Sequence, residues 1–206
     1  MDDIEFSALL VSRVCHDLVG PLGAVVNGLE VTEDERDAAM RADALKIVTS
    51  SAEQALARLQ FMRIAFGAAG SAGAELDLGE IGRLVTGLVA GTKVEVQWNA
   101  AQVHWPKDWA KLLMNAAVLA ADALPRGGVV KVETSKDQAA PSFHIVATGT
   151  NARVLEEVER AVRGEASAGP LDARGIQPYL AHKLARSLNA GLTLSAKDGV
   201  IEVVAG

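Results

Sequence analysis

Hydrophobic residues recur at steps of three and four near the start of the chain, which is the spacing of one face of a helix. They stand at Val11, Val14, Leu18, Leu22, Val25 and Leu29. We expect this helix to begin at an aspartate cap, Asp2 or Asp3, and to run to about Glu30. At about 100° per residue, His16 lies on the side opposite this apolar stripe, so its imidazole is predicted to face water.

A second helix is predicted by an apolar repeat of the heptad type further along the chain. Its apolar positions are Leu45, Val48, Ala52, Ala55, Leu59, Met62 and Phe66. The intervening residues, 32–35, are typical of a loop in which Thr32 and Glu35 form the capping box of the second helix. Because this connection is short, the two helices are expected to pack as antiparallel neighbours.

The two helices alone cannot cover both apolar stripes, and Ile47 and Phe61 add further apolar surface. We therefore expect a homodimer in which two hairpins form a four-helix bundle, an arrangement that leaves the His16 side open. The alternative is that each hairpin packs against the second domain of its own chain.

The composition changes after a run of glycine, alanine and serine, residues 67–74, which marks a domain boundary. We divide the chain into a helical dimerisation domain at 1–68, a linker at 69–76 and a second domain at 77–206. In the second domain the pattern predicts helices at 78–89, 107–124, 154–162 and 176–188, strands at 94–98, 129–133 and 142–146, a loop at 164–175, and a hairpin of 191–194 with 200–204. The expected fold class is α+β: an antiparallel helical hairpin followed by an α/β sandwich with a mostly antiparallel sheet.

The composition of the chain limits which kinds of partner and which cellular compartment we expect for it. The net charge of −6 and the sequence pI of about 5.3 argue against nucleic acid. The acidic start lacks the basic and apolar segments of a signal peptide, and no uninterrupted apolar stretch approaches the ~20 residues of a membrane span. The single cysteine, Cys15, excludes an internal disulfide, suits a reducing cytoplasm, and is expected to be partly buried.

The surroundings of His16 favour access by another molecule. Its side of the helix carries mostly small or polar residues, which are Ser12, Gly20, Gly23 and Asn27, with Arg13 and Val19 at the edges. Glycine inside a helix costs roughly 1 kcal/mol relative to alanine, so glycines here indicate close approach of a partner. Pro21 has no N–H, leaves the carbonyl of Asp17 without its helical donor, and is predicted to bend the helix.

The run from His16 to Leu22, His-Asp-Leu-Val-Gly-Pro-Leu, resembles the phosphoacceptor box of histidine kinases. Extended to Glu30, it resembles the ChpT-type histidine phosphotransferases of alphaproteobacteria. This resemblance implies that His16 accepts and donates a phosphoryl group, while Asp17 orients the imidazole by bonding Nδ1 and leaves Nε2 as the nucleophile. It also implies, as partners, the receiver domain of a hybrid histidine kinase and response-regulator receivers in cell-cycle or developmental control, whose own Mg²⁺ serves the transfer. The residues expected to dock these receivers are Ser12, Arg13, Val19, Gly20, Gly23 and Asn27.

The second domain resembles the ATP-binding domain of histidine kinases in the order of its elements, but its nucleotide motifs are eroded. Asn115 matches a metal-holding asparagine of that family, whereas Lys111 replaces an earlier one. The adenine-binding aspartate is missing from 146–151, and the glycine-rich lid is reduced to Gly175, with Pro178 removing a backbone donor. We therefore expect no bound ATP, cofactor or metal, with Asn115 as a helix-surface residue and the domain as a docking surface and support.

Two further classes of function stay open: an active ATP-dependent histidine kinase with divergent nucleotide motifs, and a non-catalytic scaffold that binds receivers. Autophosphorylation from ATP would identify the kinase, and a His16→Ala variant that keeps its function would identify the scaffold.

The remaining histidines, His104, His144 and His182, are expected at the surface or half-buried, with no acidic cluster that would make them metal ligands.

Overall fold

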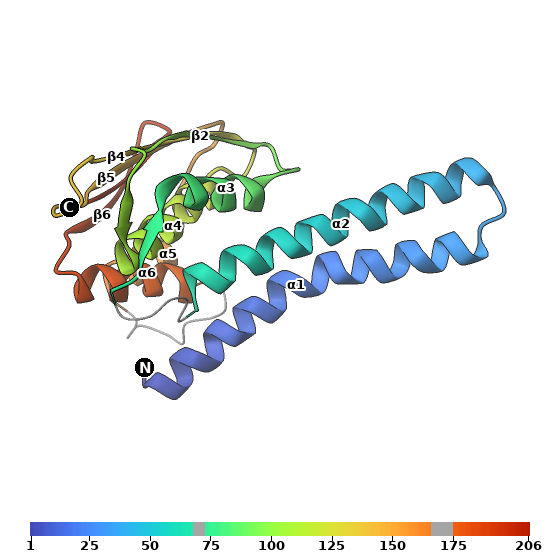
Figure 1. The fold of residues 1–206 in the computed structure, drawn as a ribbon, viewed down its shortest axis with the longest axis horizontal. Helices are drawn as coiled ribbons and strands as arrows, with labels where there is room; N and C mark the ends of the chain where they lie inside the picture. The colour runs from blue at the N-terminus through green and yellow to red at the C-terminus, as the bar shows by residue number, and fades with distance from the viewer. Residues whose placement is uncertain (68–72, 166–174) are drawn as a thin grey trace.

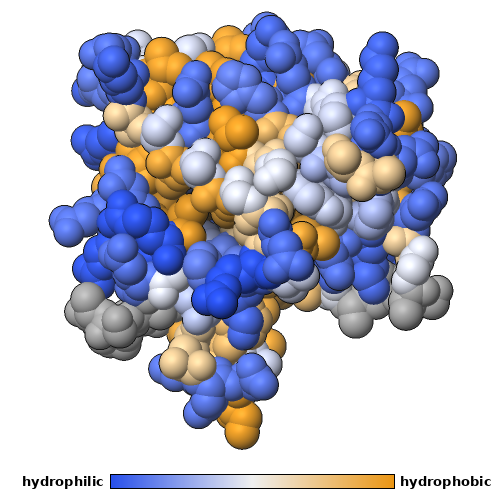
Figure 2. Space-filling view, turned by 90° about the vertical axis from the view of Figure 1, so that its left-hand side faces the viewer, coloured by the Kyte–Doolittle hydropathy of each residue, from blue (hydrophilic) through white to orange (hydrophobic). Residues whose placement is uncertain are grey.

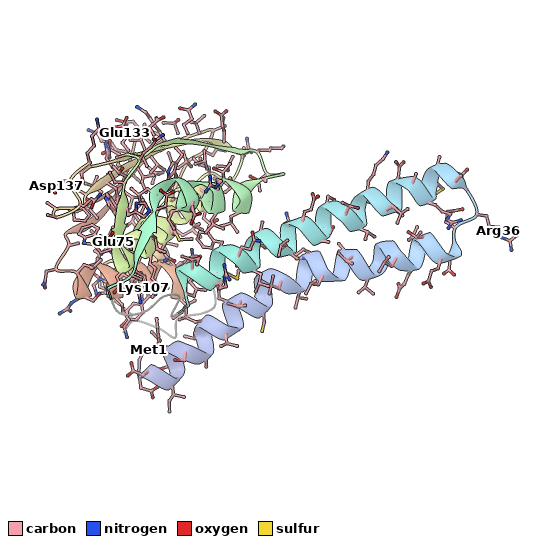
Figure 3. The ribbon with its side chains drawn as sticks, in the orientation of Figure 1. Met1, Arg36, Glu75, Lys107, Glu133 and Asp137 are labelled. Carbon is pink, nitrogen blue, oxygen red and sulfur yellow. The ribbon has the colours of Figure 1, made fainter. Side chains whose placement is uncertain are left out.

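The computed structural model of the chain describes residues 1–67, 73–165 and 175–206. Two long helices, α1 (Asp3–Asp34) and α2 (Ala38–Ala65), form a hairpin that projects from an α/β domain (Figure 1). The hairpin meets that domain at its base, while Arg36 at its tip points into solvent (Figure 3). The predicted antiparallel pair of helices is therefore confirmed.

The first helix begins as predicted and ends later than predicted. Asp2 caps α1 by accepting a hydrogen bond from the Glu5 amide at 2.8 Å. The helix then continues past its expected end and includes Thr32, whose hydroxyl donates to the Gly28 carbonyl one turn earlier. The predicted capping box is therefore wrong. The N-cap of α2 is Asp37, whose carboxylate accepts hydrogen bonds from two amides of the first turn.

The apolar stripes of both helices are only partly covered within one chain. On α1, Val11 and Leu29 are exposed, and the end of the helix that carries Ile4 projects below the α/β domain with apolar groups on its outside (Figure 2). On α2 the predicted stripe is divided, because Met62 is buried in the core of the α/β domain whereas Leu45 is exposed. By length and composition α1 is apolar enough to cross a membrane, and hardly any of it is buried, although Arg13 and Asp17 interrupt its apolar residues.

The α/β domain is built on a five-stranded sheet that carries its helices on one face. The strands are β2 (Val94–Asn99), β4 (Gly128–Thr134), β5 (Phe143–Thr148), β6 (Leu192–Lys197) and β7 (Val200–Ala205), arranged in the order β2-β4-β5-β7-β6. Only β2 and β4 pair in parallel, so the sheet is mostly antiparallel as predicted. Alternate side chains turn toward the helices: Val130 and Val132 are buried, whereas Lys131 between them faces solvent.

Among the residues that the structure describes, the helices of the α/β domain lie between the sheet and the hairpin (Figure 1), and each falls close to its predicted range. They are α3 (Leu78–Val89), α4 (Lys107–Asp122), α5 (Glu156–Val162) and α6 (Ile176–Ser187). The central helix α4 is buried without interruption from Leu112 to Ala121. Helix α2 packs on α3 and α4, and α1 packs on α6, where the rings of Phe6 and Tyr179 meet edge to face. The hairpin and the α/β domain therefore share an extended contact.

A second, two-stranded antiparallel sheet was not predicted. It pairs β1 (Glu75–Asp77) with β3 (His104–Pro106), which places fully buried Trp105 opposite Leu76. Strands of this length are too short to show an alternating pattern in the sequence. The predicted linker at 69–76 runs into β1, and its first part, like most of the predicted loop at 164–175, lies outside the described residues. The α+β fold class is confirmed, and the exact domain boundaries stay a prediction.

Candidate functional site

His16 lies near the middle of α1 with its side chain 67% exposed, on the side of the helix that the apolar pattern indicated. Its Nδ1 atom lies 3.1 Å from Oδ1 of the next residue, Asp17. In the tautomer that donates from Nδ1, the carboxylate accepts this hydrogen bond and the lone pair is left on Nε2. The ring is then free to act as a nucleophile toward a molecule that approaches from solvent.

The carboxylate of Asp17 is held from its other side by Arg13, one turn earlier on α1. The Nε atom of Arg13 donates to Oδ2 of Asp17 at 2.7 Å. Both side chains are largely covered and line the cleft between the hairpin and the α/β domain. A partly buried, charge-assisted pair fixes a carboxylate more firmly than an exposed pair does. The structure therefore places Arg13, an expected docking residue, inside this cleft.

The backbone of Asp17 carries a further contact that the sequence analysis missed. Pro21 lies within α1 and has no N–H, so the Asp17 carbonyl lacks its usual donor four residues on. In its place, Nη1 of Arg58 on α2 donates to this carbonyl at 3.0 Å. Helix α1 also changes direction part-way along its length (Figure 1), as expected for a helix with an internal proline. The signal in the sequence was the unpaired carbonyl itself, which requires a donor from a neighbouring element.

A cavity of about 240 Å³ lies beside His16, between the hairpin and the α/β domain. Residues of α1 form one wall, and the opposite wall includes Asp122 at the end of α4, Arg153 before α5, and Gln177 and Pro178 in α6. Two parts of the chain that are far apart in sequence thus meet next to the imidazole. The α/β domain shapes the surroundings of His16 as much as the hairpin does.

Charged and polar groups from both parts of the chain gather in the cleft. Asp122 is exposed at its surface, yet the protein packed around its carboxyl group desolvates that group and raises its pKa. The charge of Asp17 adds to this rise in pKa, whereas Arg13 and Arg58 oppose it. The buried Gln177 presents a side-chain nitrogen that has no hydrogen-bond partner among the described residues. The carboxyl groups of Asp17 and Asp122 and the guanidinium groups of Arg13 and Arg58 therefore lie together at the junction of the hairpin and the α/β domain.

The other expected docking residues lie on the open side of α1. All of them are exposed, and they are Ser12, Val19, Gly20, Gly23 and Asn27. A Cβ atom added at Gly20 or Gly23 would meet no atom within 4 Å, so packing within the chain requires neither glycine. At Gly28, by contrast, it would lie 2.6 Å from Cγ2 of Val48, so this glycine permits the close approach of α1 and α2. Because Gly20 and Gly23 carry no side chains, the surface around His16 leaves room for another molecule to approach the ring.

Asn115 is not on the helix surface, and that expectation is wrong. It is fully buried in α4, where its Nδ2 atom donates to the Lys111 carbonyl at 2.8 Å and reaches the Ala65 carbonyl of α2 at 3.5 Å. The error arose because α2 covers this side of α4, which the pattern of one helix cannot show. Lys111 is also largely covered, and burial lowers the pKa of its ammonium group.

The remaining candidates for chemistry lie apart from one another. Cys15 is exposed rather than partly buried, because the α1 face that carries it is left uncovered within the chain. His104 and His144 are exposed, and His182 is half-buried with Nδ1 2.9 Å from the Val162 carbonyl. Within residues 1–67, 73–165 and 175–206, no group of three or more His, Cys, Asp or Glu side chains is placed to hold a metal ion.

Comparison with known proteins identifies the family. A family model described as the histidine phosphotransferase C-terminal domain matches residues 78–200. The chain is 40% identical over 201 residues to the protein phosphotransferase ChpT of Brucella abortus (strain 2308), a match that covers 98% of this chain and 94% of that protein. A solved structure of a bacterial phosphotransferase is similar with a TM-score of 0.91 and 36% identity, covering 100% of this chain and 98% of that one. The chain therefore belongs to the ChpT-type histidine phosphotransferases, enzymes that transfer phosphoryl groups in a phosphorelay.

Proposed function

We propose that this phosphotransferase carries the phosphoryl group on His16. In this proposal His16 takes the group from the receiver domain of a hybrid histidine kinase and passes it to response-regulator receivers in cell-cycle or developmental control, without ATP. The observation that carries the proposal is an exposed imidazole whose Nδ1 atom lies against a largely covered aspartate, Asp17. That arrangement leaves Nε2 available to solvent and to a partner.

The transfer step follows from this arrangement. Nε2 of His16 attacks the phosphorus of an aspartyl phosphate, in line with the carboxylate oxygen that leaves. The N–P bond forms while the P–O bond breaks, and the leaving carboxylate keeps the electron pair. The imidazole gains positive charge, which Asp17 stabilises through the Nδ1–H hydrogen bond. A Mg²⁺ ion held by the receiver would supply positive charge to the phosphoryl oxygens, and the reverse of this step transfers the phosphoryl group to a second receiver.

The receiver is proposed to dock on the open side of α1, where Ser12, Val19, Gly20, Gly23 and Asn27 are exposed. In-line attack requires the two reacting atoms to come within about 3–3.5 Å. Small side chains around His16 therefore favour the approach of the receiver to its imidazole. Arg13 contributes by holding Asp17 from within the cleft. The α/β domain, which closes the far side of the cavity, is proposed to support the site and dock the receiver without binding nucleotide.

We further propose that two chains associate through their hairpins into a four-helix bundle in the cytoplasm. The part of the hairpin around Arg36 stands away from the α/β domain (Figure 3). Large apolar side chains are exposed on the two helices on either side of this tip, and they are Val26, Leu29, Val31, Met40, Leu45 and Ile47. At the base, Phe61 and Met62 pack into the α/β domain of their own chain, so the proposed contact between chains is confined to the part of the hairpin beyond that base. Association would remove the exposed apolar surface that makes α1 resemble a membrane span.

The dimer is tested by placing a charge in this surface. Ile47→Glu should convert a dimer into a monomer in analytical ultracentrifugation, because a carboxylate buried in an apolar bundle has no partner. Lys46→Glu, at the adjacent exposed position, is the matched control and should remain dimeric. A wild-type chain that sediments as a monomer would contradict the proposal.

Phosphotransfer is tested with a phosphorylated receiver and purified protein. Radiolabel should move from the receiver to the wild type and not to His16→Ala, and labelled ATP alone should label neither. Labelling by ATP would instead identify a histidine kinase. A His16→Ala variant that restores signalling in cells as well as the wild type would identify a receiver-binding scaffold.

A further inference from the structure

The carbonyl of Asp17 is an unusual position in α1, because the helix itself provides no donor for it. In a regular helix the N–H of residue 21 would donate to this carbonyl, but Pro21 has no N–H. A largely covered carbonyl without a donor is costly, and such groups nearly always find a partner. The residue affected is the one whose side chain contacts His16. The break in the helix therefore falls beside the imidazole.

Arg58 supplies the missing donor from the opposite helix. Its Nη1 atom lies 3.0 Å from the Asp17 carbonyl oxygen, across a separation of 41 residues in sequence. The guanidinium is held in the cleft rather than in solvent: it shares a cavity of about 250 Å³ with Arg13, Asp17 and Asp122, and its Nε atom is buried. A hydrogen bond from a charged donor in such a place is stronger than one between neutral groups. Arg58 thus fixes the backbone of Asp17 while Arg13 fixes its carboxylate.

We propose that Arg58 is a positioning residue for phosphotransfer, which holds the Asp17 backbone that Pro21 releases and so sets the direction of the His16 imidazole. The inference rests on the proposed function of His16 and adds a residue of α2 to the site. Without the Arg58 donor, the unpaired carbonyl turns toward water, the Asp17 side chain moves with its backbone, and the Nδ1 contact of 3.1 Å is lost in part of the population. The chain thus replaces a hydrogen bond within α1 by one from α2. The geometry of the site therefore depends on how the two helices of the hairpin pack.

The geometry predicts a specific dependence between Arg58 and Pro21. Arg58→Met should slow transfer from a phosphorylated receiver roughly ten- to a hundredfold, because a small displacement of a reacting group is enough for such a loss. Pro21→Ala restores the N–H that the Asp17 carbonyl lacks, so in this background Arg58→Met should slow transfer less than about threefold. Arg58→Lys, which retains a charged donor, should keep most of the rate. Arg63→Met, a matched removal of an exposed arginine from the same helix, should transfer at the wild-type rate.

A purely structural role for Arg58 predicts other results. Arg58→Met would then slow transfer by the same factor with and without Pro21, and that outcome overturns the proposal, as does an unchanged rate in Arg58→Met. Nitrogen NMR of the His16 ring provides a readout that needs no activity. The Nδ1-protonated tautomer should dominate in the wild type, fall in Arg58→Met and return in Arg58→Met/Pro21→Ala. A wild type that takes no phosphoryl group refutes the proposed function instead, and the NMR series then still decides whether Arg58 orients the ring.

Discussion

At the scale of single residues, Asp17 is the most constrained group in the site. Its carboxylate contacts Nδ1 of His16 and accepts from Arg13, and its carbonyl accepts from Arg58. The first contact was expected from the resemblance, the second lies within α1 itself, and the third comes from the packing of α2 against α1. Asp17 is thus fixed at three points, and the imidazole beside it keeps its exposure. This combination of a fixed carboxylate and an open ring suits a histidine that must enter the active site of another protein.

Replacing Asp17 by asparagine tests this role of the carboxylate. Asp17→Asn keeps the shape of the side chain and removes the negative charge that stabilises the imidazolium. Hydrogen bonds to charged groups are worth about 1.5–3 kcal/mol, so the transfer rate should fall roughly ten- to a hundredfold. The measurement is the initial rate of label transfer from a phosphorylated receiver, with Asp34→Asn at the far end of α1 as control. Equal rates for Asp17→Asn and the wild type would rule out an orienting role for the carboxylate.

At the scale of elements, the hydrophobic pattern was a good guide wherever an element was long enough to repeat it. Helix α3 occupies the range that the pattern predicted, and the mostly antiparallel sheet and its final hairpin of β6 and β7 were predicted too. The failures have specific causes. The strands β1 and β3 are shorter than the pattern can resolve. The predicted capping box of Thr32 and Glu35 was wrong because α1 continues through Thr32 and Asp37 caps α2. Arg58 and the burial of Asn115 were missed because both depend on which helix lies opposite.

The cap of α2 gives a stability test at this scale. Asp37→Ala should lower the free energy of unfolding by about 1 kcal/mol, because two amides of the first turn lose their acceptor. Thr32→Ala should change it by less than about 0.5 kcal/mol, since its hydroxyl donates within α1 and caps nothing. Urea unfolding of both variants decides between the two assignments. A larger loss in Thr32→Ala than in Asp37→Ala would restore the capping box predicted from the sequence.

At the scale of the whole molecule, the site belongs to the junction of the hairpin and the α/β domain. The cavity beside His16 has walls from both parts, and the aromatic contact between Phe6 and Tyr179 holds α1 against α6. The helices of the α/β domain enclose the charged groups behind the histidine, and Asp122 from α4 lies among them. The α/β domain therefore contributes to the electrostatics of the site.

The pH dependence of stability reports on Asp122 at this junction. Its pKa in the folded chain is raised above the ordinary value of 3.8, chiefly by desolvation, so the folded state binds the proton more tightly than the unfolded state. The wild type therefore loses stability as the pH rises from the ordinary pKa of 3.8 through the raised pKa of the folded chain. Asp122→Asn avoids this loss because its amide does not ionise. Urea unfolding between about pH 4.5 and about pH 7.5 should show the variant more stable at neutral pH, with a gap that narrows toward acid. A wild type more stable than the variant at neutral pH would mean that Arg13 and Arg58 outweigh desolvation.

The most direct test of the account is to locate the phosphoryl group after transfer. The wild-type protein is mixed with a phosphorylated receiver, quenched under alkaline conditions that preserve phosphohistidine, digested and sequenced by mass spectrometry. We expect a single phosphorylated peptide, modified at His16 and labile to acid, and no modified peptide from His16→Ala. A phosphoryl group found on His104, His144 or His182, or transfer that continues in His16→Ala, would contradict it.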